Sequence, residues 1–505
     1  MGNFIDRHAK KIQGILSCFD RIILTGTIPG ICYADGMSTL LRTKGIRIFD
    51  YTKWVEPLRE EIRTKAERLA EDNDLEIEFI RKKNFRKEDR INNIIKQRGS
   101  HPGLVHIFSA MEPCTAYKPW HNKKTHKTYL KTVSGKCLHY YFYFITAELG
   151  LCYLRVPTWS PFRLQFYCNG HNLLARRLDK KKINYEKIDN VFVQIDDLDK
   201  AQKFADDINV KRIHRQLDKI VRQYCPVIRH FASSYHWSFM QVEYATDIIF
   251  KRRNDLKLIY DEIVRTAIHS VKPENIATFL GRKLHGGYQD EMGNNFNTRI
   301  EGTCIKHRMG KVAVKMYDKF GIVLRVETVV NDVSFFKHHR RVEHRDGTWE
   351  MKDAPLKKSI YSMPMLVELM KASNRRYLEF ISAIDDPSCG IKDLNKISRS
   401  VKDGDRSYRG FNLFDGNDLE LFGAIIRGEF NISGFSNSCL RKVIKDKKGQ
   451  EVSRLLKRLR KHGLIKKIAN TYKYYLTALG RRVTATALKL REMYIIPLLR
   501  GMVVR

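Results

Sequence analysis

The chain has 505 residues, of which 93 are Lys or Arg and 56 are Asp or Glu, giving a formal net charge of +37, and 43% are hydrophobic. That hydrophobic content excludes a disordered basic tail, and the length favours about three domains. No run of roughly 18 uncharged apolar residues is present and the N-terminus lacks a hydrophobic signal core, so the sequence predicts a cytoplasmic protein without a membrane span. The surplus of cations favours a polyanionic partner.

Residues 1–112 are predicted to form an α/β domain. Strand patterns at 19–24, 46–51, 75–80 and 104–109 alternate with helix patterns at 35–44, 54–69 and 87–97. A βαβα order of this kind is typical of a mainly parallel sheet with helices packed on it.

Residues 113–384 are predicted to form a central sheet-and-helix domain with a mixed or antiparallel sheet. Strands rich in Tyr and Phe are expected at 137–146, 150–158, 162–168 and 191–195, helices over 197–284, further strands at 303–330, and a helix at 364–384. The segment 121–131 is interpreted as a polar basic loop. The aromatic strands could stack unpaired bases of a nucleic acid or fill a core, and we expect most of these rings to fill the core.

The segment 385–417 is predicted to be a linker, and 418–505 a winged helix-turn-helix. Helices are expected at 419–426, 437–444 and 450–462, strands of a wing at 464–468 and 472–476, and a last helix from 478. Between Phe435 and Arg482 the chain has 15 Lys or Arg but only two acids. A recognition helix and wing of this charge predict contact with nucleic acid. The cations assigned to that contact are Arg454, Lys457, Arg458, Lys461, Lys466, Lys467 and Lys473. The alternative is a protein-binding winged helix with a solvated basic face.

The strongest catalytic pattern lies in residues 305–330, which are predicted to form three antiparallel strands. Strand alternation places Lys315, Tyr317 and Lys319 on one face of the middle strand, and Arg325 and Glu327 on one face of the next. Such a face suits a phosphodiester held near a carboxylate-bound metal. The alternative is a surface ladder of opposite charges.

The segment GKVAVKMYDKFGIVLRVET (310–328) resembles the strand pair of plasmid and phage rolling-circle replication initiators. The resemblance covers some 20–30 residues and implies a sheet that binds single-stranded DNA, with Glu327 as a metal ligand and a tyrosine that nicks DNA. After Glu327 the chain offers Phe335 and Phe336 rather than such a tyrosine. The whole chain also resembles a multicopy, mobile-element-associated bacterial family with a C-terminal winged helix, which implies no particular chemistry.

Further carboxylates could complete a nuclease site that binds Mg²⁺ or Mn²⁺. Glu243 and Asp247 lie four residues apart, on one face of a predicted helix, and Asp20 begins the first predicted strand. Phosphoryl transfer with metal ions uses paired carboxylate oxygens of this kind. Each could instead form an ordinary ion pair or cap a turn.

Together these patterns predict a nucleic-acid-binding protein of a mobile or replicating element, with DNA as the favoured partner and metal-dependent strand nicking or transfer as its activity. Two alternatives stay open. One is a non-enzymatic winged-helix transcription regulator, and the other is a ribonucleoprotein component that binds structured RNA. An oligomer is compatible with each of them.

Overall fold

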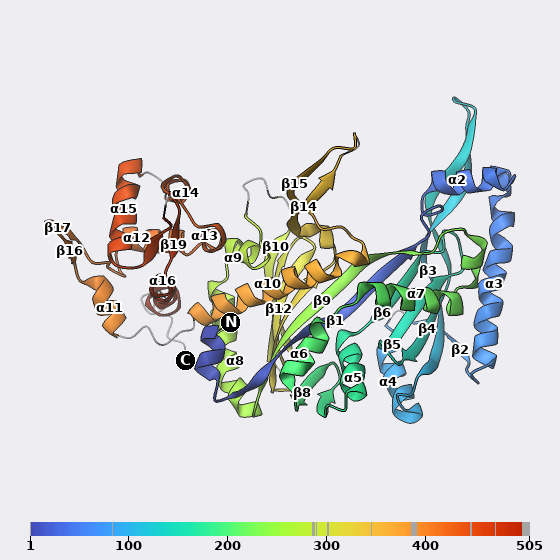
Figure 1. The fold of residues 1–505 in the computed structure, drawn as a ribbon, viewed down its shortest axis with the longest axis horizontal. Coiled ribbons are helices and arrows are strands. Elements are labelled where there is room, and N and C mark those ends of the chain that lie inside the picture. The colour runs from blue at the N-terminus through green and yellow to red at the C-terminus, as the bar shows by residue number, and fades with distance from the viewer. Residues whose placement is uncertain are drawn as a thin grey trace. The chain divides into compact units, whose positions relative to one another are not determined.

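The structure is a computed structural model, and it is a mixed α/β protein (Figure 1). It describes residues 2–82, 84–284, 288, 290–299, 302–344, 346–384, 391–444, 447–469 and 471–496. Among these residues, no helix combines the length and the apolar character needed to cross a bilayer.

Eleven strands form one hydrogen-bonded sheet in the order β10-β11-β12-β13-β9-β1-β6-β5-β4-β3-β2. The chain divides into two compact units, one comprising 1–16, 245–329 and 368–505 and the other 17–244 and 330–367. The four boundaries fall inside the strands β1 (Ile12–Thr27), β9 (His236–Phe250) and β13 (Val323–Val330) and inside the helix α10 (Met363–Ile384).

The unit formed by 17–244 and 330–367 contains the part of the sheet that leads from β1 through β6 to β2. The strands that lie wholly in this unit are β2 (Ile77–Phe79), β3 (Gly103–Asn122), β4 (Lys127–Thr146), β5 (Gly150–Pro157), β6 (Leu164–Cys168), β7 (Tyr185–Ile188), β8 (Val191–Ile195), β14 (Lys337–Glu343) and β15 (Trp349–Pro355). Its helices are α2 (Ala34–Thr43), α3 (Tyr51–Glu71), α4 (Lys87–Arg98), α5 (Gly170–Lys180), α6 (Leu198–Asp206) and α7 (Val210–Tyr224).

Apolar side chains of α4 pack on the aromatic strands of this unit. Ile91 of α4 lies in one buried cluster with Phe108 of β3 and with Tyr141 and Tyr143 of β4. The predicted strands at 137–146, 150–158, 162–168 and 191–195 are confirmed as β4, β5, β6 and β8. All five rings of the 140–144 run are buried, although successive strand residues face opposite sides of the sheet.

Two predictions for the N-terminal region are wrong. The segment 46–51 is not a strand but a 3₁₀ turn (Ile48–Asp50) that leads into α3. The sheet there is not mainly parallel, because β1 pairs antiparallel with β6, β3 pairs antiparallel with β4, and only the short β2 pairs in parallel with β3.

The predicted basic loop at 121–131 is the end of a continuous hairpin, in which β3 and β4 pair out to Asn122 and Lys127.

The other unit begins with α1 (Gly2–His8) and contains the opposite end of the sheet. Its remaining strands are β10 (Met292–Arg299), β11 (Gly302–Met309), β12 (Val312–Lys319), β16 (Val401–Asp403), β17 (Arg406–Tyr408), β18 (Ile465–Lys467) and β19 (Tyr474–Leu476). Its helices are α8 (Arg253–Ser270), α9 (Pro273–Phe279), α10 (Met363–Ile384), α11 (Ile391–Ser398), α12 (Gly416–Ile425), α13 (Gly428–Ser433), α14 (Asn437–Val443), α15 (Gly449–Lys461) and α16 (Ala478–Leu490).

The predicted strands over 303–330 are confirmed as β11, β12 and β13, and β11 pairs antiparallel with β12. The predicted helical region 197–284 is wrong over 236–250, which forms β9. The predicted C-terminal helices and strands are present as α12, α14, α15, β18, β19 and α16. Their assignment to a nucleic-acid-binding winged helix stays a prediction.

The segment predicted as a linker carries regular structure in its described residues. It contains α11 and the hairpin β16–β17. Ile397 and Phe411 from this segment share one buried cluster with Phe422, Leu456 and other apolar residues of the C-terminal helices. Residues 391–417 are therefore part of the same core as the helices that follow.

Candidate metal centre

Asp20 lies in the middle of β1, where three polar side chains from two later segments, the start of α5 and the turn between β7 and β8, reach its carboxylate. Asn190 donates from Nδ2 to Oδ1 at 2.7 Å, Asn169 donates from Nδ2 at 3.5 Å, and His171 Nδ1 lies 3.1 Å from the same oxygen. Asp20 is 7% exposed and His171 is fully buried. These contacts fix the orientation of a carboxylate that water barely reaches.

A glycine allows this arrangement. Gly170 is the first residue of α5, and a Cβ there would lie 2.1 Å from the backbone oxygen of Phe19. Any larger residue would push α5 away from β1. Asn169 also caps α5, since its side chain accepts from the backbone N–H of Asn172.

Glu243 lies on β9, which neighbours β1 in the sheet. The prediction that Glu243 and Asp247 share a helix face is therefore wrong in its secondary structure, although residues four apart also share a face of a strand. Glu243 is 7% exposed, and Gln241 donates from Nε2 to its Oε1 at 2.9 Å.

Glu327 lies on β13, which neighbours β9 on its other side. Lys315 Nζ lies 3.3 Å from Oε2 of Glu327, and the Tyr317 hydroxyl donates to the same oxygen at 3.2 Å. Strand alternation had placed Lys315 and Tyr317 on one face, and their shared contact with Glu327 confirms it. Glu327 is only 1% exposed.

The three carboxylates converge. Asp20, Glu243 and Glu327 each place one oxygen within 4.8 Å of the others, and all three are buried. Like charges this close repel strongly once water is excluded, and buried charges in proteins are paired or coordinate metals. An all-oxygen set suits a hard divalent cation such as Mg²⁺ or Mn²⁺.

Cationic side chains near the carboxylates offset part of this repulsion. Burial disfavours the charge on Arg21, but Glu243, Tyr167, Glu88 and Asp20 together raise its pKa above the ordinary value. Arg21 therefore stays fully charged beside the acidic cluster.

A cavity of about 1110 Å³ is open to Asp20 and Arg21. Its walls include Tyr153 and Tyr167, whose rings stack with centroids 5.1 Å apart and planes 13° apart. Burial raises the pKa of Tyr153 to about 12, so its hydroxyl stays protonated at neutral pH. The remainder of the wall combines apolar residues with acids and with cations, among them Lys96, Arg176 and Lys187.

Two of the predicted functional residues serve the fold instead. Arg325 donates to Asp247 from Nε at 2.6 Å and from Nη2 at 2.7 Å, and neither side chain is exposed beyond 1%. Arg325 was predicted to hold phosphate and Asp247 to hold a metal. Both side chains are engaged with each other, because the guanidinium donates one hydrogen bond to each oxygen of the carboxylate. Lys319 is half-buried, with Nζ 5.4 Å from the centre of the Phe320 ring.

The cations predicted for the C-terminal contact divide into two groups. Arg454, Lys457, Lys466, Lys467 and Lys473 are exposed. Lys461 is half-buried and pairs with Asp403 at 2.6 Å. Arg458 is buried, so its predicted outward position is wrong. Its guanidinium makes two bonds to Asp418, at 2.6 and 2.8 Å, and lies 3.9 Å from the Phe411 ring centre.

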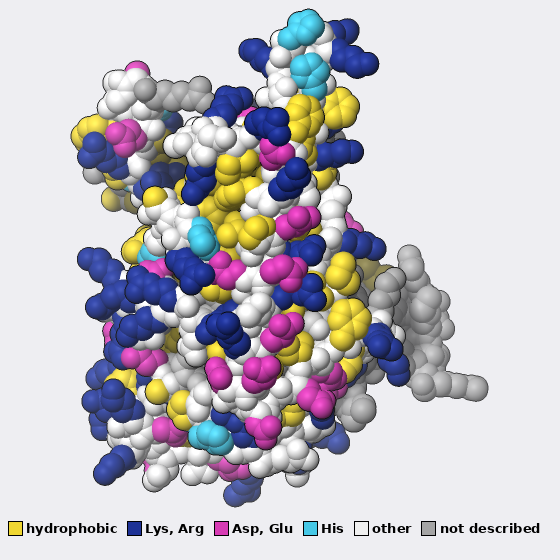
Figure 2. Space-filling view, turned by 90° about the vertical axis from the view of Figure 1, so that its right-hand side faces the viewer, with side chains coloured by type: hydrophobic (Ala, Val, Ile, Leu, Met, Phe, Trp, Pro, Cys, Tyr) yellow, Lys and Arg dark blue, Asp and Glu magenta, His cyan; other side chains and the backbone are white. Residues whose placement is uncertain are grey.

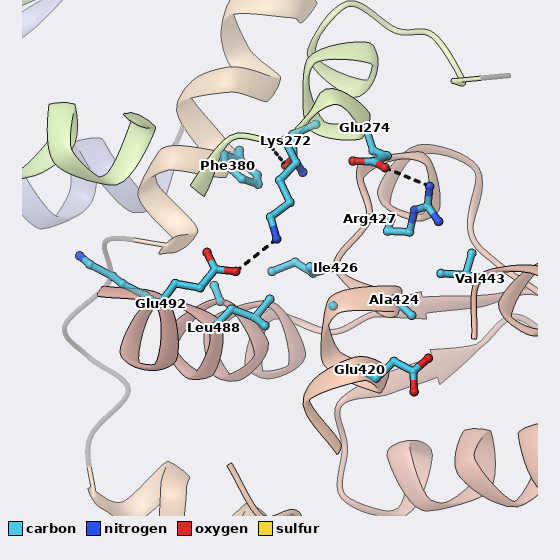
Figure 3. A pocket seen from close by; sticks show the side chains of 14 residues that line it. Lys272, Glu274, Phe380, Glu420, Ala424, Ile426, Arg427, Val443, Leu488 and Glu492 are labelled. Atoms are coloured by element: carbon cyan, nitrogen blue, oxygen red, sulfur yellow. Dashed lines mark hydrogen bonds and ion pairs between the residues drawn. The ribbon is translucent and has the colours of Figure 1, made fainter. Parts of the chain in front are cut away.

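A second cavity, of about 360 Å³, lies among α9, α12 and α16 (Figure 3). Its apolar walls include Phe380, Ile426 and Leu488. Two ion pairs border it, Lys272 with Glu492 at 3.2 Å and Arg427 with Glu274 at 3.3 Å. This cavity lacks the clustered carboxylates of the first site and suits a small, partly apolar molecule.

Sequence analysis named all three carboxylates but missed the residues that orient Asp20. His171 and Asn190 are far from Asp20 in the chain, and no spacing pattern connects either of them with it. A partial signal was the pair Asn169-Gly170, which combines a helix cap with a residue that permits close backbone approach.

No family model matches the chain, and no curated protein or solved structure matches it either. The chemistry of the site therefore rests on its own residues.

Proposed function

We propose that the protein is a metal-dependent enzyme that cleaves phosphodiester bonds of nucleic acid, with Asp20, Glu243 and Glu327 holding Mg²⁺ or Mn²⁺. The observation that carries the proposal is the convergence of these three buried carboxylates to within 4.8 Å. All three lie on strands, and ligands carried on strands or helices are positioned more precisely than ligands on loops.

The proposed reaction is a hydrolysis. A water oxygen forms a bond to phosphorus, one phosphorus–oxygen ester bond breaks, and the departing oxygen takes a proton from solvent. A bound divalent cation would polarise the phosphate and help to deprotonate the attacking water. Arg21, which keeps its charge beside the carboxylates, is suited to bind the phosphate whose charge grows during the reaction.

The lysine and tyrosine beside Glu327 are positioning residues in this proposal. Both contact Oε2 of Glu327, and Tyr317 is 7% exposed. The Tyr317 hydroxyl is engaged with a carboxylate and barely accessible. We therefore favour water over Tyr317 as the nucleophile.

Two observations support nucleic acid as the substrate. The net charge of +37 favours association with a polyanion. The cavity beside Asp20 offers the stacked Tyr153 and Tyr167 rings together with cations, the combination that binds unpaired bases and their phosphates. Cleavage of this type would suit a mobile or replicating element.

The test uses purified full-length protein with Mg²⁺ or Mn²⁺ on single-stranded DNA, duplex DNA and RNA, with chelator as the blank. Asp20→Asn, Glu243→Gln and Glu327→Gln should each lower the cleavage rate by more than the ~10–100-fold typical of changes around a metal's ligands. Glu343→Gln, which alters an exposed carboxylate on β14, is the matched control and should cleave normally.

A second measurement separates metal binding from catalysis. Saturating Mn²⁺ should raise the melting temperature of the unaltered protein, because a ligand that binds only the folded state stabilises it. The three triad variants should lose this rise, and Glu343→Gln should keep it. Equal cleavage and an equal temperature rise in all variants would refute the proposal.

The cavity of Figure 3 favours one other function, that of a DNA-binding regulator whose affinity responds to a small molecule. The cavity is bordered by α12 and α16, which belong to the same C-terminal segment as the exposed cations of α15. A protein that binds duplex DNA but cleaves no nucleic acid with any metal would favour this function over the enzyme.

A further inference from the structure

The end of the β3–β4 hairpin has an unusual charge composition. We define the arm as residues 115–134, which comprise the outer parts of β3 and β4 and the turn between them. The arm contains five Lys and two His and no Asp or Glu, and the acid-free stretch extends from 113 to 147. Figure 2 shows these basic side chains and His gathered at the tip of the hairpin, at the top of the view.

One face of the arm is anchored to its own unit. The Tyr117 hydroxyl donates to the backbone oxygen of Ile31 at 2.8 Å, and the backbone N–H of Leu130 donates to Ser38 Oγ at 3.2 Å. Tyr117 and Leu130 are buried, 4% and 1% exposed. The arm is therefore an ordered ribbon supported by α2, not a loose loop.

The opposite face presents cations and an aromatic ring to solvent. Lys118 and Lys131 are direct cross-strand partners, as are Trp120 and Tyr129, so the four side chains share one face. Lys118 and Lys131 are exposed, and Trp120 is 47% exposed with Lys131 Nζ 5.2 Å from its ring centre. Like charges directly opposite one another destabilise a strand pair, and a phosphate bound between them would remove that cost.

We infer that the arm binds duplex DNA, with its Lys118, Trp120 and Lys131 face against the groove and the tip lysines on the phosphates. This inference rests on the proposed function in one respect, that the partner is a nucleic acid. The major groove of B-form DNA admits a two-stranded β-ribbon, whereas the major groove of A-form RNA is too narrow for one. The arm supplies such a ribbon with no acid to repel the backbone.

The test compares two triple variants that each remove three positive charges. The arm variant is Lys118→Gln, Lys127→Gln and Lys131→Gln. The control is Lys53→Gln, Lys200→Gln and Lys203→Gln, exposed lysines of the same unit, two of which pair with acids, Lys53 with Asp50 and Lys200 with Asp197. Binding to a labelled duplex of about two helical turns is measured in chelator, so that no cleavage takes place.

The arm variant should bind duplex DNA at least tenfold more weakly at moderate salt, and the slope of log affinity against log salt should fall by about 0.9 for each lysine that contacts a phosphate. The control should bind within twofold of the unaltered protein. The circular dichroism spectra and melting temperatures of both variants should match those of the parent.

An arm variant that binds duplex DNA as the control does would overturn the inference. An equal loss of affinity for duplex RNA or single strands would overturn it too, since the ribbon would then not be reading a B-form groove. Both results leave the proposed function intact, because metal binding and cleavage depend on the triad. Conversely, arm-dependent DNA binding without metal-dependent cleavage would refute the proposed function and support the inference.

Discussion

Arg325 and Asp247 form a bonded pair in the interior of the sheet, with Nε–Oδ1 and Nη2–Oδ2 distances of 2.6 and 2.7 Å. Both side chains are essentially inaccessible to solvent. Two charges excluded from water in this way are held by one another, and neither is available to a ligand.

Removing one partner of this pair should be far more damaging than removing both. Asp247→Ala leaves a buried guanidinium without its carboxylate and should lower the free energy of unfolding by about 3–5 kcal/mol. The double variant Asp247→Leu with Arg325→Met restores apolar packing and should be more stable than Asp247→Ala alone. Urea unfolding curves measure both values. A double variant as unstable as the single one would show that the pair itself stabilises the sheet.

Arg458 should contribute to stability, whereas Arg454 on the same helix should not. Arg458 is buried against Asp418 and Phe411, so Arg458→Ala should lower the free energy of unfolding by roughly 3 kcal/mol. Arg454 is exposed, and Arg454→Ala should change the free energy of unfolding by no more than about 0.5 kcal/mol. Thermal or urea unfolding distinguishes the two, and equal effects would contradict the inward position of Arg458.

The sequence predicts local arrangement well where strand alternation decides it. Lys315, Tyr317 and Glu327 could be placed together because β12 and β13 are consecutive strands with a short turn. Their facing side chains follow from the period of two. The C-terminal helices were likewise predictable from apolar spacing and caps.

The same reasoning failed where distant segments decide the structure. Glu243 and Asp247 share a face in either a helix or a strand, and the pattern of residues 242–250 fits both, so only pairing with β1 and β13 selects β9. Arg458 was placed outside because the apolar residues of its helix were assigned to the inward face. Its partner Asp418 lies forty residues away, beyond the reach of that pattern. The convergence of Asp20 with Glu243 and Glu327 depends on strand order, which no local pattern reveals.

His307 should make stability depend on pH. It is fully buried between Asn294, at 2.7 Å from Nδ1, and Tyr377, at 3.1 Å from Nε2, and burial lowers its pKa to about 3. An unfolded histidine titrates near 6.5, so below that pH the unfolded chain takes up a proton that the folded protein refuses. Stability is unaffected above about pH 6.5 and falls as the pH drops from there towards 3.

His307 alone should lower the free energy of unfolding by about 2 kcal/mol between neutral pH and roughly pH 5. Urea unfolding at neutral pH and at about pH 5 should show it. His307→Gln should be less stable at neutral pH, because two hydrogen bonds change, but should lose less stability on acidification. All other groups titrate equally in the unaltered protein and in His307→Gln, so their contributions cancel when the two losses of stability are subtracted. Identical losses in the two would place the pH sensitivity elsewhere.

Tyr317 separates hydrolysis from covalent strand transfer. Its hydroxyl donates to Oε2 of Glu327 at 3.2 Å, so Tyr317→Phe removes one hydrogen bond that orients a proposed metal ligand. Loss of one such hydrogen bond should weaken the affinity for the metal by up to about tenfold. Tyr317→Phe should therefore retain measurable cleavage with a modestly weaker Mn²⁺ affinity, and denaturing gels should show no DNA attached to the unaltered protein. If Tyr317 were instead the nucleophile, the phenylalanine variant would lose all cleavage and the unaltered protein would carry a covalent DNA adduct.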